Sequence, residues 1–185
     1  PQPAEALPAD TLGYLSLDRD PSGSQKIEAY NTLKKFPAIE QVFDEEGVEE
    51  GTDLRRKFLE EALAEDEDCD LDYDADIEPW LGERFAVAAV AQGEDEPPAP
   101  VFVVQTSDAD AAEATFEKLN ECSGGEDEGG AGWAINDDWA LLAETSEIAE
   151  SAAEGAAESS LADDADFQKW TSAAGDAGIV QGYAS

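Results

Sequence analysis

The sequence predicts a single α+β domain over residues 1–185, with a mixed, mostly antiparallel sheet of about five or six strands packed by helices. Strand-like and helix-like segments follow one another in irregular order, which disfavours a doubly wound sheet. Hydrophobic residues make up 42% of the chain, including four Trp, four Tyr and seven Phe. A chain of 185 residues with this content can bury a core of its own.

Strands are indicated where apolar residues alternate with polar ones or form short runs between turn residues. The expected strands lie at 9–18, 83–92, 101–106, in two arms of a hairpin within 132–144, and at 178–185. The strands at 83–92 and 101–106 are expected to form a second hairpin across a polar turn. The hairpin within 132–144 is expected to turn on Asn136, Asp137 and Asp138, which are turn-forming residues.

Helices are indicated where apolar residues recur every three or four positions. The expected helices lie at 24–36, 37–47, 52–64, 108–121, 145–159 and 161–175. The segment "TDLRRKFLEEALAED" gives the clearest pattern, with one apolar face formed by Leu54, Phe58, Leu59, Ala62 and Leu63. Its basic cluster, residues 55–57, is expected to form internal ion pairs in so acidic a chain.

A short internal echo links the two ends of the chain. "LGYLSLD" near the start and "IVQGYAS" at the end share a Gly-Tyr step within a predicted strand. The last strand is interpreted either as the first strand of a second, similar unit or as a chance match.

Net charge restricts the classes of partner. The chain has 46 acidic residues against 10 basic ones, which gives a net charge of −36. This field repels nucleic acid and anionic lipid surfaces, so cations and basic proteins are the permitted charged partners. The simplest interpretation of the charge is solubility or adaptation to salt. No run of 18 apolar residues occurs, so no segment of this sequence is expected to insert into a bilayer.

The residue types predict that the protein is not an enzyme and holds no cofactor. The sequence contains no His, which excludes Ser–His and Cys–His nucleophilic pairs. It has neither a phosphate-binding Gly-rich loop nor a dinucleotide fingerprint. Pairs of carboxylates are unspecific in a chain with 46 acids.

The stretch "EDEDCDLDYDADIEPWLGE", residues 65–83, places aspartates at alternating positions. The candidates for weak calcium binding are Asp66, Asp68, Asp70, Asp72, Asp74 and Asp76. Their spacing fails the EF-hand pattern, because a frame begun at Asp66 has Leu71 in place of Gly and Ile77 in place of Glu. An extended segment would present these carboxylates as a row rather than a cage.

Two other residue sets have alternative interpretations. Cys69 and Cys122 are compatible with one disulfide in an oxidising compartment, or with two unpaired thiols in the cytosol. Four tryptophans are expected to pack in the core or at its rim rather than to stack on a ligand. These residues are Trp80, Trp133, Trp139 and Trp170.

Several motifs carry a resemblance to a known family. They are "LPADTLGYLSLD", "QKIEAYNTLKKFP", "DADIEPWLGERFAVAAV", "SDADAAEATFEKL" and "SLADDADFQKW" followed by "GYAS". With them the chain resembles the domain of unknown function 3352 family over residues 3–185. Members of this family are largely bacterial, and they often carry one N-terminal membrane segment before an extracytoplasmic region. The resemblance implies an extracytoplasmic chain tethered by a segment that this sequence lacks. It also favours a Cys69–Cys122 disulfide joining the ends of helices 52–64 and 108–121. It supplies no catalytic residues.

The leading hypothesis is therefore a non-enzymatic cell-surface module with a structural or partner-binding role. One alternative is a carrier or sensor of a small apolar ligand held between sheet and helices. The other is a calcium-dependent adhesion module. The sequence identifies neither the protein partner nor the ligand.

Overall fold

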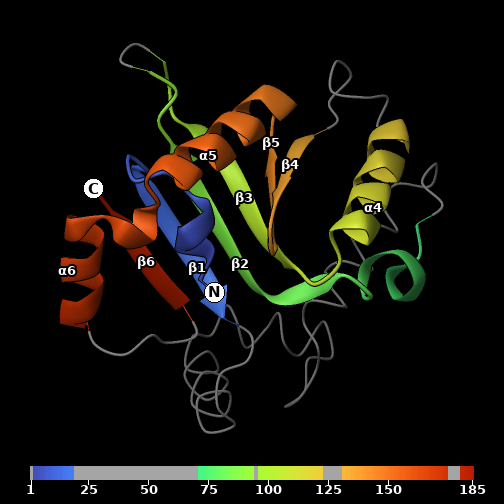
Figure 1. Ribbon diagram of the computed structural model, residues 1–185, viewed down its shortest axis with the longest axis horizontal. Coiled ribbons are helices and arrows are strands. Elements are labelled where there is room, and N and C mark those ends of the chain that lie inside the picture. Colours follow the sequence, from blue (N-terminus) through green and yellow to red (C-terminus); the bar gives the residue numbers. More distant parts are fainter. Residues whose placement is uncertain (1, 19–70, 94–95, 123–130, 175–179) are drawn as a thin grey trace, which may run out of the picture.

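The computed structural model describes residues 2–18, 71–93, 96–122, 131–174 and 180–185. A single six-stranded sheet in the order β4-β5-β3-β2-β1-β6 runs through the described part (Figure 1). Its strands are β1 (Gly13–Asp18), β2 (Leu81–Val90), β3 (Ala99–Thr106), β4 (Gly132–Asn136), β5 (Trp139–Ala143) and β6 (Val180–Ala184). Every neighbouring pair is antiparallel. The predicted α+β class is confirmed, and the sheet is antiparallel throughout rather than mixed.

Helices flank this sheet on both faces. They are the short turns η1 (Pro3–Ala6), η2 (Tyr73–Ile77) and η4 (Leu161–Asp163), and the helices α4 (Ala109–Cys122), α5 (Ser146–Glu158) and α6 (Ala165–Ala174). The helices predicted at 108–121 and 145–159 are confirmed. The helices predicted at 24–36, 37–47 and 52–64 lie outside the described residues.

The helix predicted over 161–175 is divided in two. Asp164 has extended backbone angles, φ −65° and ψ 131°, between η4 and α6. Its carboxylate accepts a hydrogen bond from the N–H of Phe167 at 2.7 Å, as an N-terminal cap does. A capping side chain therefore starts a new helix where periodicity alone predicted a continuous one.

Both predicted hairpins are present. β2 and β3 pair from Val90 opposite Ala99 to Leu81 opposite Thr106, with a register shift between Leu81 and Phe85. β4 and β5 are joined by a tight turn in which Asp137 has φ 51°. Aspartate tolerates this left-handed conformation better than most residues, which explains the turn at this position.

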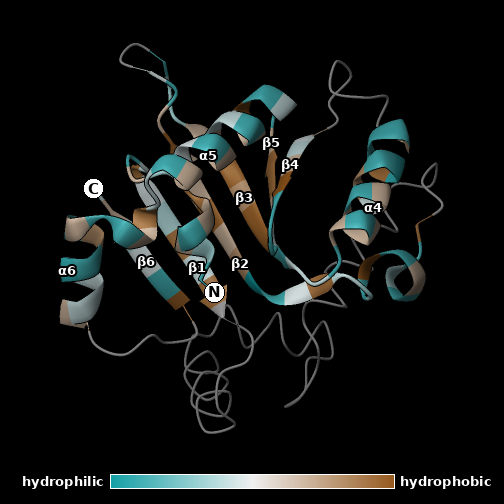
Figure 2. Cartoon of the chain, in the orientation of Figure 1, coloured by the Kyte–Doolittle hydropathy of each residue, from teal (hydrophilic) through white to brown (hydrophobic). Residues whose placement is uncertain are grey.

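One face of the sheet is covered by η1, α5, η4 and α6 and holds the larger core (Figure 1). Most strand side chains on this face are small or branched, with the rings of Tyr14 and Trp139 among them. In Figure 2, brown strands lie under helices whose outer surfaces are teal. α5 contributes only alanines to full burial: Ala149, Ala152 and Ala156. The start of α5 lies so close to β4 that a Cβ on Gly132 would come within 1.8 Å of the Ser146 nitrogen. A glycine is therefore required at this crossing.

The opposite face is covered at its β4 and β5 end by α4 and η2. Their smaller core contains Tyr73, Ile77, Trp80, Ala112, Phe116 and Ala140. α4 is the helix predicted over 108–121, and its residues Ala112, Thr115 and Phe116 are buried there. η2 and α4 bring the segment that was rich in aspartate directly against the sheet.

Candidate functional site

The acidic stretch contains a helical turn, η2, where its last aspartates are described. Asp66, Asp68 and Asp70 lie outside the described residues, whereas the three aspartates that follow them lie at and within η2. Asp72 accepts a hydrogen bond from the N–H of Ala75 at 2.9 Å, and the carboxylate of Asp76 accepts one from the N–H of Asp72 at 2.9 Å. The expectation of an extended row of carboxylates is wrong over residues 73–77, because capping by aspartate stabilises a helical turn there.

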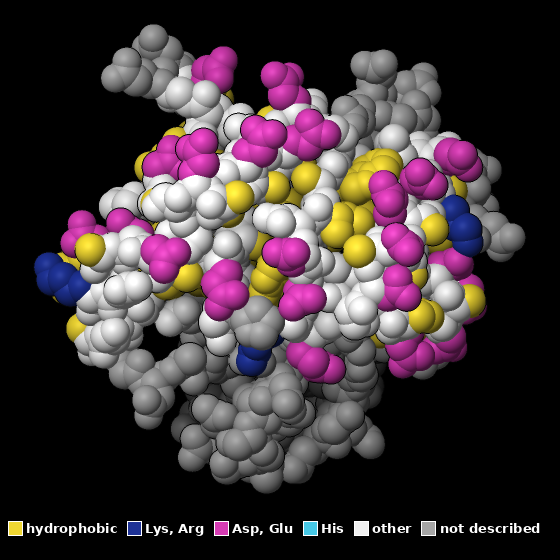
Figure 3. All heavy atoms as spheres, in the orientation of Figure 1, with side chains coloured by type: hydrophobic (Ala, Val, Ile, Leu, Met, Phe, Trp, Pro, Cys, Tyr) yellow, Lys and Arg dark blue, Asp and Glu magenta, His cyan; other side chains and the backbone are white. Residues whose placement is uncertain are grey.

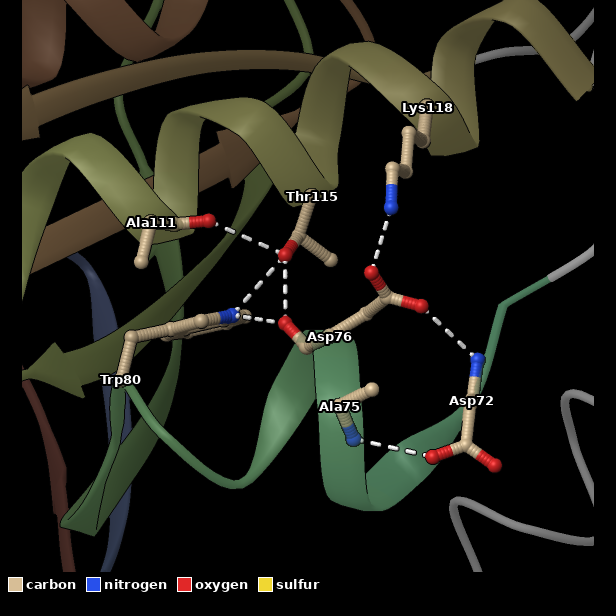
Figure 4. A network of polar contacts seen from close by, with 7 residues as sticks. All are labelled: Asp72, Ala75, Asp76, Trp80, Ala111, Thr115 and Lys118. Carbon is tan, nitrogen blue, oxygen red and sulfur yellow. Dashed lines mark hydrogen bonds and ion pairs between the residues drawn. The ribbon is translucent and has the colours of Figure 1, made fainter.

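Asp76 also forms an ion pair with Lys118 of α4 (Figure 4). The pKa of Asp76 lies below its ordinary value. The hydrogen bond from the N–H of Asp72 lowers it most, and the Lys118 ammonium lowers it further. Asp76 therefore joins the turn to the helix, and its carboxylate is already matched by a donor and a cation.

A network of hydrogen bonds ties the same turn to α4 and to the start of β2 (Figure 4). The indole Nε1 of Trp80 donates to the carbonyl of Asp76 at 2.6 Å and to the hydroxyl of Thr115 at 3.0 Å. That hydroxyl lies 2.6 Å from the Asp76 carbonyl and 3.0 Å from the Ala111 carbonyl. Because Trp80 and Thr115 are both buried, these bonds satisfy polar groups that water cannot reach.

Replacing Thr115 by Val is expected to lower the free energy of unfolding by about 1 kcal/mol, because the network loses its central hydroxyl. Urea unfolding followed by tryptophan fluorescence measures the change. The matched control is Thr171→Val, since the Thr171 hydroxyl bonds only helix carbonyls, with the Phe167 carbonyl at 2.7 Å. The control should change stability by less than about 0.5 kcal/mol. Equal losses in both variants would contradict a clamp between η2 and α4.

Asp76→Asn is expected to change the pH dependence of stability. A folded-state pKa below the unfolded value stabilises the protein above the unfolded pKa of about 3.9, and the benefit is lost as pH falls through the folded value. The difference in urea midpoint between wild type and variant should therefore be largest near neutral pH. It should disappear below about pH 4. Glu113→Gln, which removes a carboxylate from the exposed side of α4, is the matched control. A gap that stays constant down to low pH would exclude this role for Asp76.

The described part of the chain contains no cluster of carboxylates arranged to bind calcium. Within it, no group of three or more acidic, Cys or His side chains is arranged to hold a metal ion. The carboxylate of Asp72 accepts a hydrogen bond within η2. The carboxylate of Asp76 accepts one from the N–H of Asp72 and pairs with Lys118. For the whole run of six aspartates, calcium binding stays a prediction.

The tryptophan predictions are confirmed for three residues and wrong for one. Trp80 and Trp139 are buried, and Trp133 packs half-buried against the smaller core. Trp170 is 58% exposed on α6, with the Nζ atom of Lys169 lying 4.6 Å from its ring centroid. α6 lies at the rim of the sheet (Figure 1), and Phe167 is its buried residue.

Two rows of apolar side chains cross the second face of the sheet. Residues directly opposite one another on antiparallel strands point to the same face. One row contains Leu15, Val87, Phe102, Leu142 and Trp133, and the next contains Val180, Leu17, Phe85, Val104, Ala140 and Ile135. The β4 and β5 end of both rows packs under α4 and η2. The rows continue onto β1, β2, β3 and β6, where no described helix lies over them.

The exposed end of these rows is called here the apolar half-face: Leu15, Leu17, Phe102 and Val180. Phe102 is 54% exposed and Val180 is 56% exposed. Sequence reasoning missed this surface, although "VFVVQT" carries a signal, because an unbroken apolar run places hydrophobic side chains on both faces of a strand. On the face shown in Figure 3, acidic side chains are spread over the part of the surface that the described residues form.

Cys122 is the last residue of α4, and Cys69 lies outside the described residues. The Cys69–Cys122 pairing therefore stays a prediction. No helix within the described ranges is long and apolar enough to cross a membrane.

Comparison with protein families gives one match. The family described as "Protein of unknown function (DUF3352)" matches residues 1–127 of the 185, which includes β1, η2, β2, β3 and α4. Neither a curated protein nor a solved structure matches the chain.

Proposed function

The chain belongs to the DUF3352 family of proteins of unknown function, and from this premise we propose that it is a non-enzymatic, partner-binding module that works outside the cytoplasm, tethered to the cell membrane. The observation that carries the proposal is the apolar half-face. Large apolar side chains on one contiguous, exposed surface mark sites of interaction in soluble domains.

The sheet offers this surface on a rigid support. Phe102 lies on β3, between β2 and β5, and Leu15 and Leu17 lie on β1, between β2 and β6. A surface on central strands changes shape little upon binding, so less conformational entropy is lost when a partner docks. The net charge of −36 repels nucleic acid and acidic membranes over long range. These molecules therefore do not compete with a protein partner for the apolar half-face.

A non-enzymatic role is supported by how the aspartates near α4 are used. Asp72 caps η2, and Asp76 bonds the N–H of Asp72 and pairs with Lys118. Carboxylates already committed to structural contacts are poor candidates for acid or base catalysis, which needs a group free to exchange a proton with substrate.

The proposed location depends on a disulfide between Cys69 and Cys122. In Figure 4, the chain enters η2 from the side on which α4 runs toward its C-terminal end. Cys69 precedes Asp72 by three residues, a reach of at most about 10 Å. We propose that Cys69 is bonded to Cys122, and such a bond persists in oxidising compartments outside the cytoplasm.

Site-specific photocrosslinking in the cells that produce the protein tests partner binding. A photoreactive phenylalanine analogue in place of Phe102 should yield one discrete crosslinked species. The same analogue in place of Glu154, exposed on α5 over the other face, should not. Adding Leu17→Lys to the Phe102 probe should abolish the crosslink, because a charge then lies in the apolar half-face. Crosslinks that are absent, or equal at both positions, would contradict the proposal.

A further inference from the structure

Within the described residues, β6 is an edge strand of uncharged composition. It ends the strand order, and within the described residues no strand pairs with its outer edge. Natural edge strands are commonly blunted by charged residues, proline or bulges. β6 reads Val-Gln-Gly-Tyr-Ala, with no charge and no proline, in a chain of which 30% is charged. An edge of this composition is suited to accept another strand.

The Gly-Tyr echo is in register between β1 and β6. Tyr14 lies directly opposite Tyr183, and a glycine precedes each of them, Gly13 and Gly182. Antiparallel strands that pair equivalent residues are related by a local two-fold axis. Phe167 of α6 touches both tyrosine rings edge-on, at centroid distances of 5.6 Å from Tyr14 and 5.1 Å from Tyr183. The two strands therefore have equivalent positions and a shared aromatic contact.

This local symmetry indicates what the outer edge of β6 fits. The two-fold axis relates it to the edge of β1 that pairs with β2. On β2, Ala89 lies opposite Gly13, Ala88 opposite Tyr14 and Val87 opposite Leu15. Transferred to β6, the same pattern places small residues opposite Gly182 and Tyr183, and a branched apolar residue opposite Ala184.

We infer that the outer edge of β6 is a strand-addition site for an extended, β2-like segment of a partner protein, with two small residues followed at the Ala184 position by an apolar one. Main-chain hydrogen bonds would supply affinity and the small residues would supply specificity, as in other strand-addition complexes. The exposed Trp170 lies on α6, which packs against β6. This inference rests on the proposed function and names the binding mode of the partner.

Charge argues against a second copy of the chain as the occupant. Each copy carries a net charge of −36, so two copies repel one another at moderate salt. A partner with fewer acidic residues does not meet this repulsion.

The probe is a synthetic peptide with the sequence of β2, residues 81–90, added to the intact chain. Amide chemical shifts should change at β6 and at Trp170, and leave β4, the opposite edge, unchanged. A peptide with proline in place of Ala88 should bind at least about tenfold more weakly, because proline removes a ladder hydrogen bond. Shifts at β4 instead of β6, or none, would overturn the inference.

A variant of the protein gives a second test. The N–H of Ser185 donates to the carbonyl of Leu12 at 3.0 Å, so alternation turns the N–H of Ala184 outward. Ala184→Pro should keep the fold, since edge strands tolerate proline at outward positions, and should lose peptide binding. Dimerisation of wild type without peptide, prevented by Ala184→Pro, would make a second copy the occupant and overturn the inference. A crosslink at Phe102 without peptide binding would refute only this edge site; failure of both experiments would refute the proposed function as well.

Discussion

Replacing Phe116 by Ala is expected to lower the free energy of unfolding by about 3–5 kcal/mol. Phe116 is only 5% exposed and lies between two tryptophan rings. Its ring centroid is 5.3 Å from that of Trp80, edge-on, and 6.0 Å from that of Trp133. Truncation leaves a cavity between α4 and the sheet, and it removes a ring that touches both tryptophans.

Phe102→Ala is the matched control for this effect. It removes the same side chain from β3, but Phe102 is 54% exposed, so the expected loss of stability is within about 0.5 kcal/mol. Urea unfolding of both variants gives the comparison. A large loss for Phe102→Ala would mean that this residue is buried in the folded protein and would remove it from the apolar half-face.

Replacing Cys122 by Ser is expected to cost about 4 kcal/mol if the proposed bond to Cys69 is present, because a loop of about 50 residues is then no longer closed in the unfolded chain. Wild type unfolded in the presence of a reductant should lose the same amount, and the reductant should leave the variant unchanged. Thermal and urea unfolding measure these four conditions. Equal stability in all four would contradict the bond.

Peptide mapping without reduction provides the chemical check on the same bond. A linked pair of peptides containing Cys69 and Cys122 should appear, lighter by the mass of two hydrogens than the two free peptides. Two free thiols would remove the main support for an oxidising location.

Local signals account for the parts of the fold that the sequence predicted. The β4–β5 hairpin was predictable because Asp137 and Asp138 favour a turn between two apolar arms. The buried side of α4 was predictable because Ala112 and Phe116 are four positions apart. Strand order was not predicted, because pairings such as β1 with β6 join residues far apart in the chain and leave no local pattern.

The candidate site was harder to predict because competing local interactions decide it. Alternating aspartates resemble an extended strand, but the cap formed by Asp72 and the pairing of Asp76 with Lys118 favour a helical turn. The strand predicted at 83–92 begins earlier, at Leu81, and Gly82 lies within it, where a Cβ would come within 2.7 Å of the Gln105 side chain. The exposure of Phe102 depends on which helices cover the sheet, and strand periodicity does not reveal that.

The most direct test of the account is the location of the protein in living cells. Lys169 is exposed on α6, so its amine is accessible to reagents in solution. Intact cells that produce the protein can be treated with a membrane-impermeant amine reagent, and labelling at Lys169 can be measured by mass spectrometry. An extracytoplasmic module should be labelled at Lys169 before the cells are broken. Labelling at Lys169 only after lysis, while known surface proteins are labelled in intact cells, would contradict the account.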